Sequence, residues 1–439
     1  MKHKLTRAAG IFTLFFITSV QIILAQQTRV ITLKEAIDLG VANSHLLKNN
    51  KAKIDEAVAA VTEATERKLP DASVSGSYLY LPVKPIINLK SDSSGGFGGN
   101  VKQAMYGIVS VSLPIYAGGK LRYGIEAAKY LEQAARLDAD EDREAVIFNT
   151  VNAFSNLYKS GAAVNIVKEN LQQSNQRVKD FSNLEKNGLL ARNDLLKVSL
   201  QSSNIELALL DAESNFKLAS VNMALMLGLP EQTLLIPDSV SLQQTTNVKT
   251  MEEYEQLALL ERKDAASLLL RKKVADISIK NVKADYYPSL ALTAGYVAAD
   301  IPGLITITNA VNVGAGVKYS ISSLWKTKSK IAQAEARVQQ ITSNQLMLND
   351  NIRLQINQSY QSYLLSQKKI EVYKKAVEQA TENYRITKNK YVNALATTTD
   401  LLDADVAQLQ TKLNLSNAAA DAVVAYNKLL QTAGILNNN

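Results

Sequence analysis

The chain contains no cysteine, and only two of its 439 residues are histidine. Without cysteine, a lipid-modified cysteine and a disulfide framework are excluded. Zinc sites with their usual ligands, cysteine nucleophiles and histidine general bases are nearly excluded, because cysteine is absent and histidine is scarce. The sequence therefore predicts no enzyme activity, no metal and no cofactor, and it predicts that His45 lies on a solvated helix face.

Dense clusters of positive charge are also missing, although lysine and arginine outnumber aspartate and glutamate by 49 to 41. The cations are spread along the chain without interleaved aromatic residues, so nucleic acid is not an expected partner. Gly118-Gly119-Lys120 resembles the end of a phosphate-binding loop, but the upstream glycine and the downstream serine or threonine do not fit.

Only the N-terminus carries a long apolar run. Residues 8–24 are mainly apolar, follow Lys2, Lys4 and Arg7, and end at Ala25-Gln26, which fits a cleavage point. The basic start and the immediate change to polar residues favour a cleaved signal peptide over a retained membrane anchor.

Glycine and proline are absent from residues 317–433. A span of this length without either residue predicts one or two very long helices. Apolar and small residues follow a 3-4 rhythm, which is the seam of a coiled coil. The helices expected at 120–186 and 324–390 are each roughly 100 Å long. The seam residues are Ile147, Val151, Phe154, Tyr158, Gly161, Val164, Leu171, Val178 and Phe181 in the first half, and Ile370, Tyr373, Val377, Ala380, Tyr384, Thr387 and Tyr391 in the second.

The chain carries one pattern twice. Leu69-Pro70 recurs as Tyr287-Pro288, and Asp194-Leu195-Leu196 recurs as Asp400-Leu401-Leu402. The spacing between copies shortens along the chain because the first copy has an extra loop at 88–100, which we expect on the outside. Such self-similarity indicates one supersecondary plan built twice.

This plan predicts the following organisation. A signal peptide (1–25) precedes a first repeat (26–228), a connector (229–249), a second repeat (250–436) and a polar tail (437–439). Each repeat has a helix (33–68 and 251–285), two strands (about 72–83 with 102–115, and about 289–299 with 311–321) and a helical hairpin with its tip near 188–194 or 394–400.

The predicted strands alternate between an apolar, tyrosine-rich face and a small, polar face. Val74, Tyr78 and Tyr80 alternate with serines, for example. A lipid-facing barrel wall with a wet interior has this pattern, and so does a half-buried sheet in a soluble protein. Four strands cannot close a barrel, and open edges are not tolerated in hydrocarbon, so a membrane sheet requires several chains. Three copies give twelve strands.

Asp400 and Asp403 lie three residues apart at a predicted helix start and therefore share a face. Acids in a first turn stabilise the N-terminal end of the helix dipole, which explains the pair without a function. In a trimer each aspartate would instead form a ring of three carboxylates that narrows and polarises a pore. The residues alone leave both interpretations open. The first repeat has Asp194 but Lys197 at the second position, which suits a role for one hairpin only.

The chain resembles the TolC-like outer membrane factors over essentially all of its mature length. Several short motifs carry the resemblance in the same order in both halves. They are residues 31–36 with Asn43, Leu69-Pro70, Tyr287-Pro288, residues 113–116 with Gly118-Gly119, residues 391–394 and residues 400–404.

The resemblance implies a mainly α-helical homotrimer whose chains close a twelve-stranded barrel above a periplasmic helical tunnel. It implies a pore constriction and gate at Asp400, Asp403 and Tyr391, a strand-to-helix swivel at Pro114, Gly118 and Gly119, and hairpin tips that contact a periplasmic adaptor at Gly188, Leu189, Asp194, Leu195, Ala394 and Leu395. The chain departs from the family at Ala394 and Ala396, where a glycine and an arginine are usual, so a different closing latch is expected.

The function implied is a passive exit duct for drugs and toxic compounds in the outer membrane of a Gram-negative bacterium. The implied partners are the periplasmic adaptor, an inner-membrane pump of the RND, ABC or MFS type, and outer membrane lipid. An exit duct for type I protein secretion has the same fold and is one alternative. A soluble periplasmic coiled-coil scaffold is an alternative of another class.

Overall fold

A computed structural model describes residues 28–83, 101–238, 248–302 and 304–436. The predicted signal peptide, the extra loop at 88–100 and the polar tail lie outside the described residues. The chain divides into two compact units. The hairpin unit comprises residues up to 44, 145–248 and 359–429, and the sheet unit comprises 45–144, 249–358 and 430 onward.

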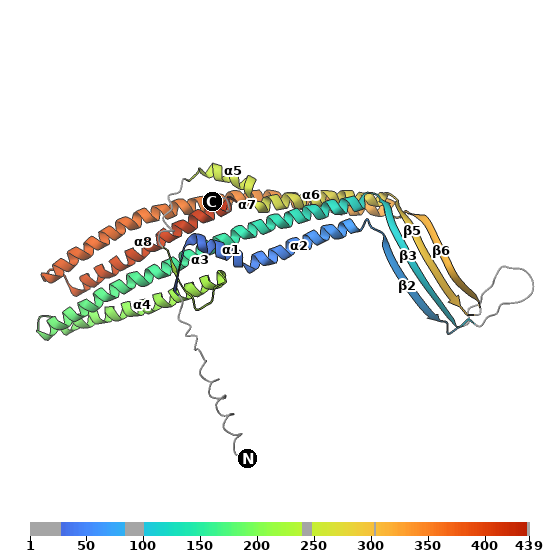
Figure 1. Cartoon of the computed structure of the whole chain (residues 1–439). Coiled ribbons are helices and arrows are strands. Elements are labelled where there is room, and N and C mark those ends of the chain that lie inside the picture. Colours follow the sequence, from blue (N-terminus) through green and yellow to red (C-terminus); the bar gives the residue numbers. More distant parts are fainter. Residues whose placement is uncertain (1–27, 84–100, 239–247, 303, 437–439) are drawn as a thin grey trace, which may run out of the picture. The chain divides into compact units, whose positions relative to one another are not determined.

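Two very long helices dominate the chain (Figure 1). Helix α3 (Lys120–Lys186) has 67 residues and α7 (Ser323–Val392) has 70. Each is followed by a return helix of 35 residues, α4 (Arg192–Met226) and α8 (Thr398–Thr432). The prediction of long helices joined as hairpins is confirmed. None of the helices in the described parts of the chain combines the length and the apolar character needed to cross a membrane.

The core of the hairpin unit is built on the α3 seam. Val151 and Phe154 are fully buried, as the 3-4 rhythm predicted. Two short parallel strands, β1 (Thr28–Ile31) and β4 (Leu234–Pro237), add to this core. The sequence did not predict them, because four residues are too few to show an alternating pattern. The cluster consists of Ile31, Leu33, Ala36, Val151, Ala153, Phe154, Leu157, Met223, Ala224, Leu227 and Leu235.

The shorter helices are broken where the sequence predicted continuous ones. The segment at 33–68 forms α1 (Leu33–Asn43) and α2 (His45–Glu66), separated at Ser44. The segment at 251–285 forms α5 (Met251–Glu261) and α6 (Lys263–Lys283), followed by a 3-10 turn, η2 (Ala284–Tyr286). At the break, the guanidinium of Arg262 donates hydrogen bonds to the neighbouring Asp264 and to two distant partners, the side chain of Gln355 and the carbonyl of Thr432. Neither Gln355 nor Thr432 is visible in the local pattern.

The sheet unit holds one antiparallel sheet in the order β2-β3-β5-β6 (Figure 1). The strands are β2 (Asp71–Tyr80), β3 (Gln103–Ala117), β5 (Ser289–Ile301) and β6 (Ile305–Lys318). The predicted strand pairs are present, but β6 begins six residues before the predicted 311 and ends at 318 rather than 321. The strand starts early because a tight turn at Pro302 leads directly into it, whereas the sequence suggested a longer loop.

The register aligns one apolar row across all four strands. Val74 pairs with Val109, Val109 with Tyr296, and Tyr296 with Val311. The neighbouring row contains Ser73, Ser110, Gly295 and Asn312, so the two faces differ in polarity as the alternation predicted. The apolar face is not covered by the described residues: Val74 is 80% exposed and Val313 82% exposed.

The two hairpin tips form the same helix-ending turn. The amide of Leu189 donates to the carbonyl of Leu184 and that of Gly188 to Glu185, while Leu395 and Ala394 make the equivalent bonds to Lys390 and Tyr391. This Schellman turn requires a left-handed residue after the helix. Gly188 adopts it at φ +72° and Ala394 at φ +60°. The second tip therefore holds an alanine in a conformation that costs an L-residue roughly 1–2 kcal/mol.

Ala394→Gly should stabilise the second tip by about 0.5–1 kcal/mol, since the strain is removed while the greater freedom of unfolded glycine offsets part of the gain. Native-state hydrogen exchange at the Leu395 amide measures the change, and exchange should slow. The matched control is Gly188→Ala, which should speed exchange at Leu189 because that position has open space and only the backbone is affected. Unchanged or faster exchange in Ala394→Gly would contradict the strain.

Asp285 joins the starts of the two long helices in the sheet unit. Its carboxylate accepts ion pairs from Lys120 at the start of α3 and from Lys330 near the start of α7. The hydrogen bond from Lys120, supported by that from Lys330, outweighs partial burial and holds the pKa of Asp285 below its usual value of 3.8. Asp285 therefore stays ionised and links η2 to both helices.

Asp285→Asn should lower the free energy of unfolding by about 1 kcal/mol at neutral pH, because solvent screens the half-exposed lysines. The folded pKa is lowered, so this stabilisation is fully present above the unfolded pKa and is lost as the pH falls through the folded value. Thermal unfolding of the purified protein, followed by circular dichroism, should show a wild-type advantage that shrinks below pH 3.8. Asp276→Asn, an exposed acid on α6, is the control. An equal effect of both variants would exclude the proposed link.

Candidate functional site

Asp400 forms a helix cap at the start of α8. The backbone amide and the hydroxyl of Thr397 both donate to its Oδ2, at 2.8 and 2.7 Å, and the amide of Asp400 donates back to the Thr397 hydroxyl at 3.1 Å. These hydrogen bonds lower the pKa of Asp400, and the bond from the Thr397 hydroxyl contributes more than the bond from its amide. The carboxylate is therefore ionised and exposed, and it also stabilises the helix start.

Asp403 lies one turn further along α8 and differs from Asp400. It is exposed and makes no hydrogen bond or ion pair with any residue that the structure describes. In the first repeat, Lys197 forms an ion pair with Asp194 at 3.4 Å. The two hairpins therefore present different charges at equivalent places: two carboxylates in one and a neutralised pair in the other.

Tyr391 packs near the tips at the end of α7. Its ring stacks on Phe181 of α3, with centroids 5.3 Å apart and planes 6° from parallel. Val198 and Leu401 are buried in the same cluster, and Leu195 packs against it. The cluster joins α3, α4, α7 and α8. Leu195 thus lies within the cluster, whereas Gly188, Leu189, Ala394 and Leu395 are exposed at the tips.

A buried ion pair lies next to this cluster. Nη1 of Arg177 donates to Oδ2 of Asp405 at 3.0 Å, and the side chains are only 8% and 1% exposed. Nη2 of Arg177 donates to the hydroxyl of Tyr384 at 3.0 Å, and the amide of Asn170 donates to the other Asp405 oxygen at 3.3 Å. Arg177 therefore links α3 to both α7 and α8.

Arg177 remains positively charged in this environment. Burial acts to lower its pKa, but the hydrogen bond and the charge of Asp405, with a contribution from Tyr384, raise the pKa above its ordinary value. Removal of one partner from such a pair is costly, because the other charge is left buried and unpaired. We refer to Arg177, Asp405 and Tyr384 as the Arg177 bridge.

The sequence did not predict this bridge. It assigned Leu171 and Val178 to the seam of α3, but both are only half-buried. The buried positions are Asn170, Ser174 and Arg177, which follow the same 4-3 spacing one residue away. Polar side chains are expected outside, so only the continuation of the spacing into Phe181 could have suggested that Arg177 is buried.

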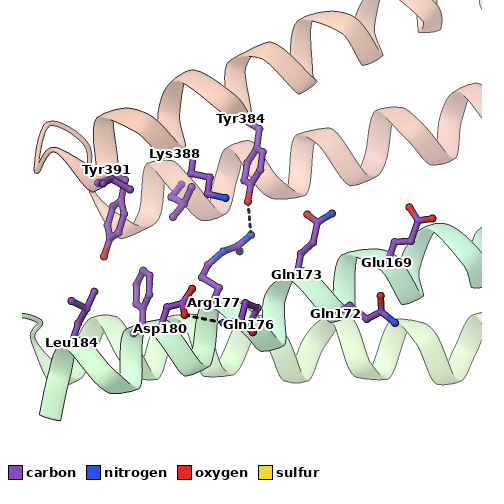
Figure 2. Close-up of a pocket in the computed structure, with 13 residues that line it drawn as sticks. Glu169, Gln172, Gln173, Gln176, Arg177, Asp180, Leu184, Tyr384, Lys388 and Tyr391 are labelled. Atoms are coloured by element: carbon purple, nitrogen blue, oxygen red, sulfur yellow. Dashed lines mark hydrogen bonds between the residues drawn. The ribbon is translucent and has the colours of Figure 1, made fainter.

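A groove of about 770 Å³ runs beside the Arg177 bridge. Figure 2 shows side chains from the first hairpin facing those of the second, with Arg177 extending toward Tyr384. Most of the α3 residues that line it are polar or charged, whereas α7 contributes two tyrosines, a lysine and a valine. Its lining comprises Glu169, Gln172, Gln173, Gln176, Arg177, Asp180, Phe181, Leu184, Tyr384, Lys388, Tyr391, Val392 and Leu401.

The predicted swivel residues lie where β3 passes into α3. The register of β3 shifts between Pro114 and Tyr116. Gly118 and Gly119 follow with φ of +62° and +90°. A Cβ on Gly118 would lie 2.7 Å from the carbonyl oxygen of Ala284, so both the conformation and the close approach require glycine there.

The chain matches a known family over most of its length. The sequence model described as outer membrane efflux protein matches residues 36–229 and 255–435, which is one segment in each half. A search of curated protein sequences found no match.

Solved structures share the fold. The outer membrane protein VceC from Vibrio cholerae is 20% identical, with a TM-score of 0.74 over 92% of this chain and 96% of that chain. CusC is 18% identical, with a TM-score of 0.77 over 92% of each chain. The CmeC outer membrane channel of Campylobacter jejuni is 19% identical, with a TM-score of 0.69 over 92% of this chain and 86% of that chain.

These matches confirm the resemblance and the fold class predicted from the sequence. Because the family match covers well over half of the chain in two repeated segments, the chain belongs to the outer membrane efflux protein family, whose members are outer membrane channels rather than enzymes.

Proposed function

We propose that the protein is the exit duct for small molecules in a three-part efflux system, working with a periplasmic adaptor and an inner-membrane pump. The four-stranded sheet supports this proposal most directly, together with the family match. Its apolar face is exposed, and β2 and β6 are its two edges. Unpaired strand edges are not stable in hydrocarbon. Three chains joined edge to edge would form a closed barrel of twelve strands.

Deletion of the gene should raise drug sensitivity while protein export stays normal. Normal drug sensitivity combined with loss of an exported protein would instead favour the type I secretion alternative.

Detergent should extract the protein from outer membranes as a heat-sensitive trimer. Recovery as a soluble monomer without detergent would overturn the barrel.

The exposed tips are the proposed contacts of the adaptor. Leu189 and Leu395 are 74% and 76% exposed, one at each tip. Since the chain has no cysteine, Leu395→Cys provides a single attachment point for a crosslinker. Capture of a periplasmic protein at Leu395→Cys but not at Leu269→Cys, an exposed leucine on α6, would support the docking site. Equal capture at both positions would exclude it.

The proposed constriction consists of Asp400 and Asp403 in the three copies of α8. Both are exposed on one turn, and the lowered pKa of Asp400 keeps its charge. Rings of carboxylates attract and retain cations in a narrow pore. Tyr391 and the Arg177 bridge would hold the hairpins together around this constriction and take the place of the latch that Ala394 and Ala396 do not provide.

Asp400→Ala/Asp403→Ala should raise the conductance in planar bilayers or abolish its sensitivity to cations, because the charged rings are removed. The matched control is Asp194→Ala/Lys197→Ala, which alters the equivalent turn of the first hairpin. Conductance like that of the wild type in the aspartate variant would exclude the constriction.

Arg177→Leu should loosen the contact between the hairpins by about 3–5 kcal/mol, because it leaves Asp405 buried and unpaired. Arg177→Leu/Asp405→Leu should cost less than Arg177→Leu alone, since no uncompensated charge remains. Hydrogen exchange of the α8 amides measures the loosening, and bilayer conductance should rise in both variants. If conductance remains at the wild-type level although exchange accelerates, the bridge stabilises the fold without holding the channel closed.

A further inference from the structure

The passage from β6 into α7 concentrates uncompensated positive charge. Residues 318–330 contain Lys318, Lys326, Lys328 and Lys330 and no acidic residue. Lys330 is paired with Asp285. The other three lysines are exposed and form no ion pair within the described chain.

Large apolar side chains are exposed in the same segment. Ile321, Leu324 and Trp325 are 65%, 55% and 62% exposed. Trp325 is the only tryptophan of the chain. An exposed tryptophan beside isoleucine, leucine and lysine is costly in water, but it suits the boundary between acyl chains and lipid headgroups.

The other strand ends in the sheet unit also combine exposed apolar residues with a nearby cation, although Asp71 and Asp285 lie beside them. Exposed Leu69 follows Lys68, exposed Ile115 and Tyr116 precede Arg122, and exposed Tyr287 follows Lys283. The register places Ala117 opposite Ser289, and Ser289 opposite Lys318, so these ends lie at one level of the sheet. We define the junction belt as Lys68, Leu69, Ile115, Tyr116, Arg122, Lys283, Tyr287, Ile321, Leu324, Trp325, Lys326 and Lys328.

We propose that the junction belt is a binding site for anionic phospholipids of the periplasmic leaflet. This inference rests on the outer membrane position of the sheet and goes beyond the exit-duct function. The apolar side chains would enter the acyl boundary, and Lys326 and Lys328 would contact lipid phosphates. Cations near a charged membrane surface gain affinity individually, without a preformed pocket. The exposed lysines of the belt suit that mode, whereas a free phosphate ion would require a closer arrangement of donors.

Trp325 provides the probe for the test, because all tryptophan fluorescence of the protein comes from this position. The trimer is reconstituted in phosphatidylcholine bilayers that contain a fixed fraction of brominated lipid, either phosphatidylglycerol or phosphatidylcholine. Bromine quenches tryptophan on contact. Quenching by brominated phosphatidylglycerol should be stronger, corresponding to about a fivefold preference for each lysine that contacts a headgroup.

Lys326→Gln/Lys328→Gln should remove most of this preference, and raised salt should weaken it in the wild type. The matched control is Lys369→Gln/Lys374→Gln, which neutralises two exposed lysines on α7 far along the chain from the belt and should retain the preference. Inorganic phosphate should weaken it no more than chloride of equal ionic strength. A specific effect of phosphate would indicate a free-anion site and overturn the lipid proposal.

The remaining outcomes separate this inference from the proposed function. Equal quenching by the two brominated lipids would overturn the anionic preference while leaving the bilayer position intact. Full preference in Lys326→Gln/Lys328→Gln would overturn the role of these lysines. Absence of quenching by either lipid would place Trp325 outside the bilayer and overturn the belt, while the barrel would stand, because Trp325 lies on α7 beyond the end of β6.

Discussion

The 3-4 seam of the long helices is the constraint on which the rest of the chain depends. A helix keeps one face toward its partners over many turns only if the spacing of its buried residues averages 3.5. Along α7 this spacing runs through Ile352, Ile356, Ser359, Tyr363 and Ser366, all buried, and continues through half-buried residues to Tyr391. Both hairpins can therefore run for many turns and still end in defined contacts.

The composition of the seam changes along α3. Near Phe154 most buried residues are apolar, with Thr150 and Ser155 as exceptions, whereas between Val167 and Phe181 the buried residues are Asn170, Ser174 and Arg177. An apolar seam stabilises more strongly, because a buried ion pair gains little over apolar residues of the same size. Buried polar residues instead reject wrong alignments, as at polar positions in coiled coils. A contact that is specific but only moderately stabilising suits a part of the molecule that we propose must separate.

The differences between the two repeats mark where their roles diverge. Lys197 neutralises Asp194 in the first hairpin, whereas the second has Asp403 exposed next to Asp400. The tips also differ: Gly188 fits its left-handed turn, whereas Ala394 is strained in the equivalent turn. Such strain persists only where the surrounding structure enforces it. Both changes affect the second hairpin, which also carries the tyrosines that contact Phe181 and Arg177.

The sequence by itself determined the features that repeat over many residues. The long helices, the alternating strands and the duplication each extend over ten or more positions, so local chemistry specifies them without knowledge of partners. It also predicted the two hairpin tips, and the family resemblance singled out Asp400, Asp403 and Tyr391. Only the tertiary structure decided the break at Arg262, the β1–β4 pair and the burial of Arg177 against Asp405. Each of these depends on contacts between residues far apart in the chain, and a single polar residue carries no local sign of the partner that will bury it.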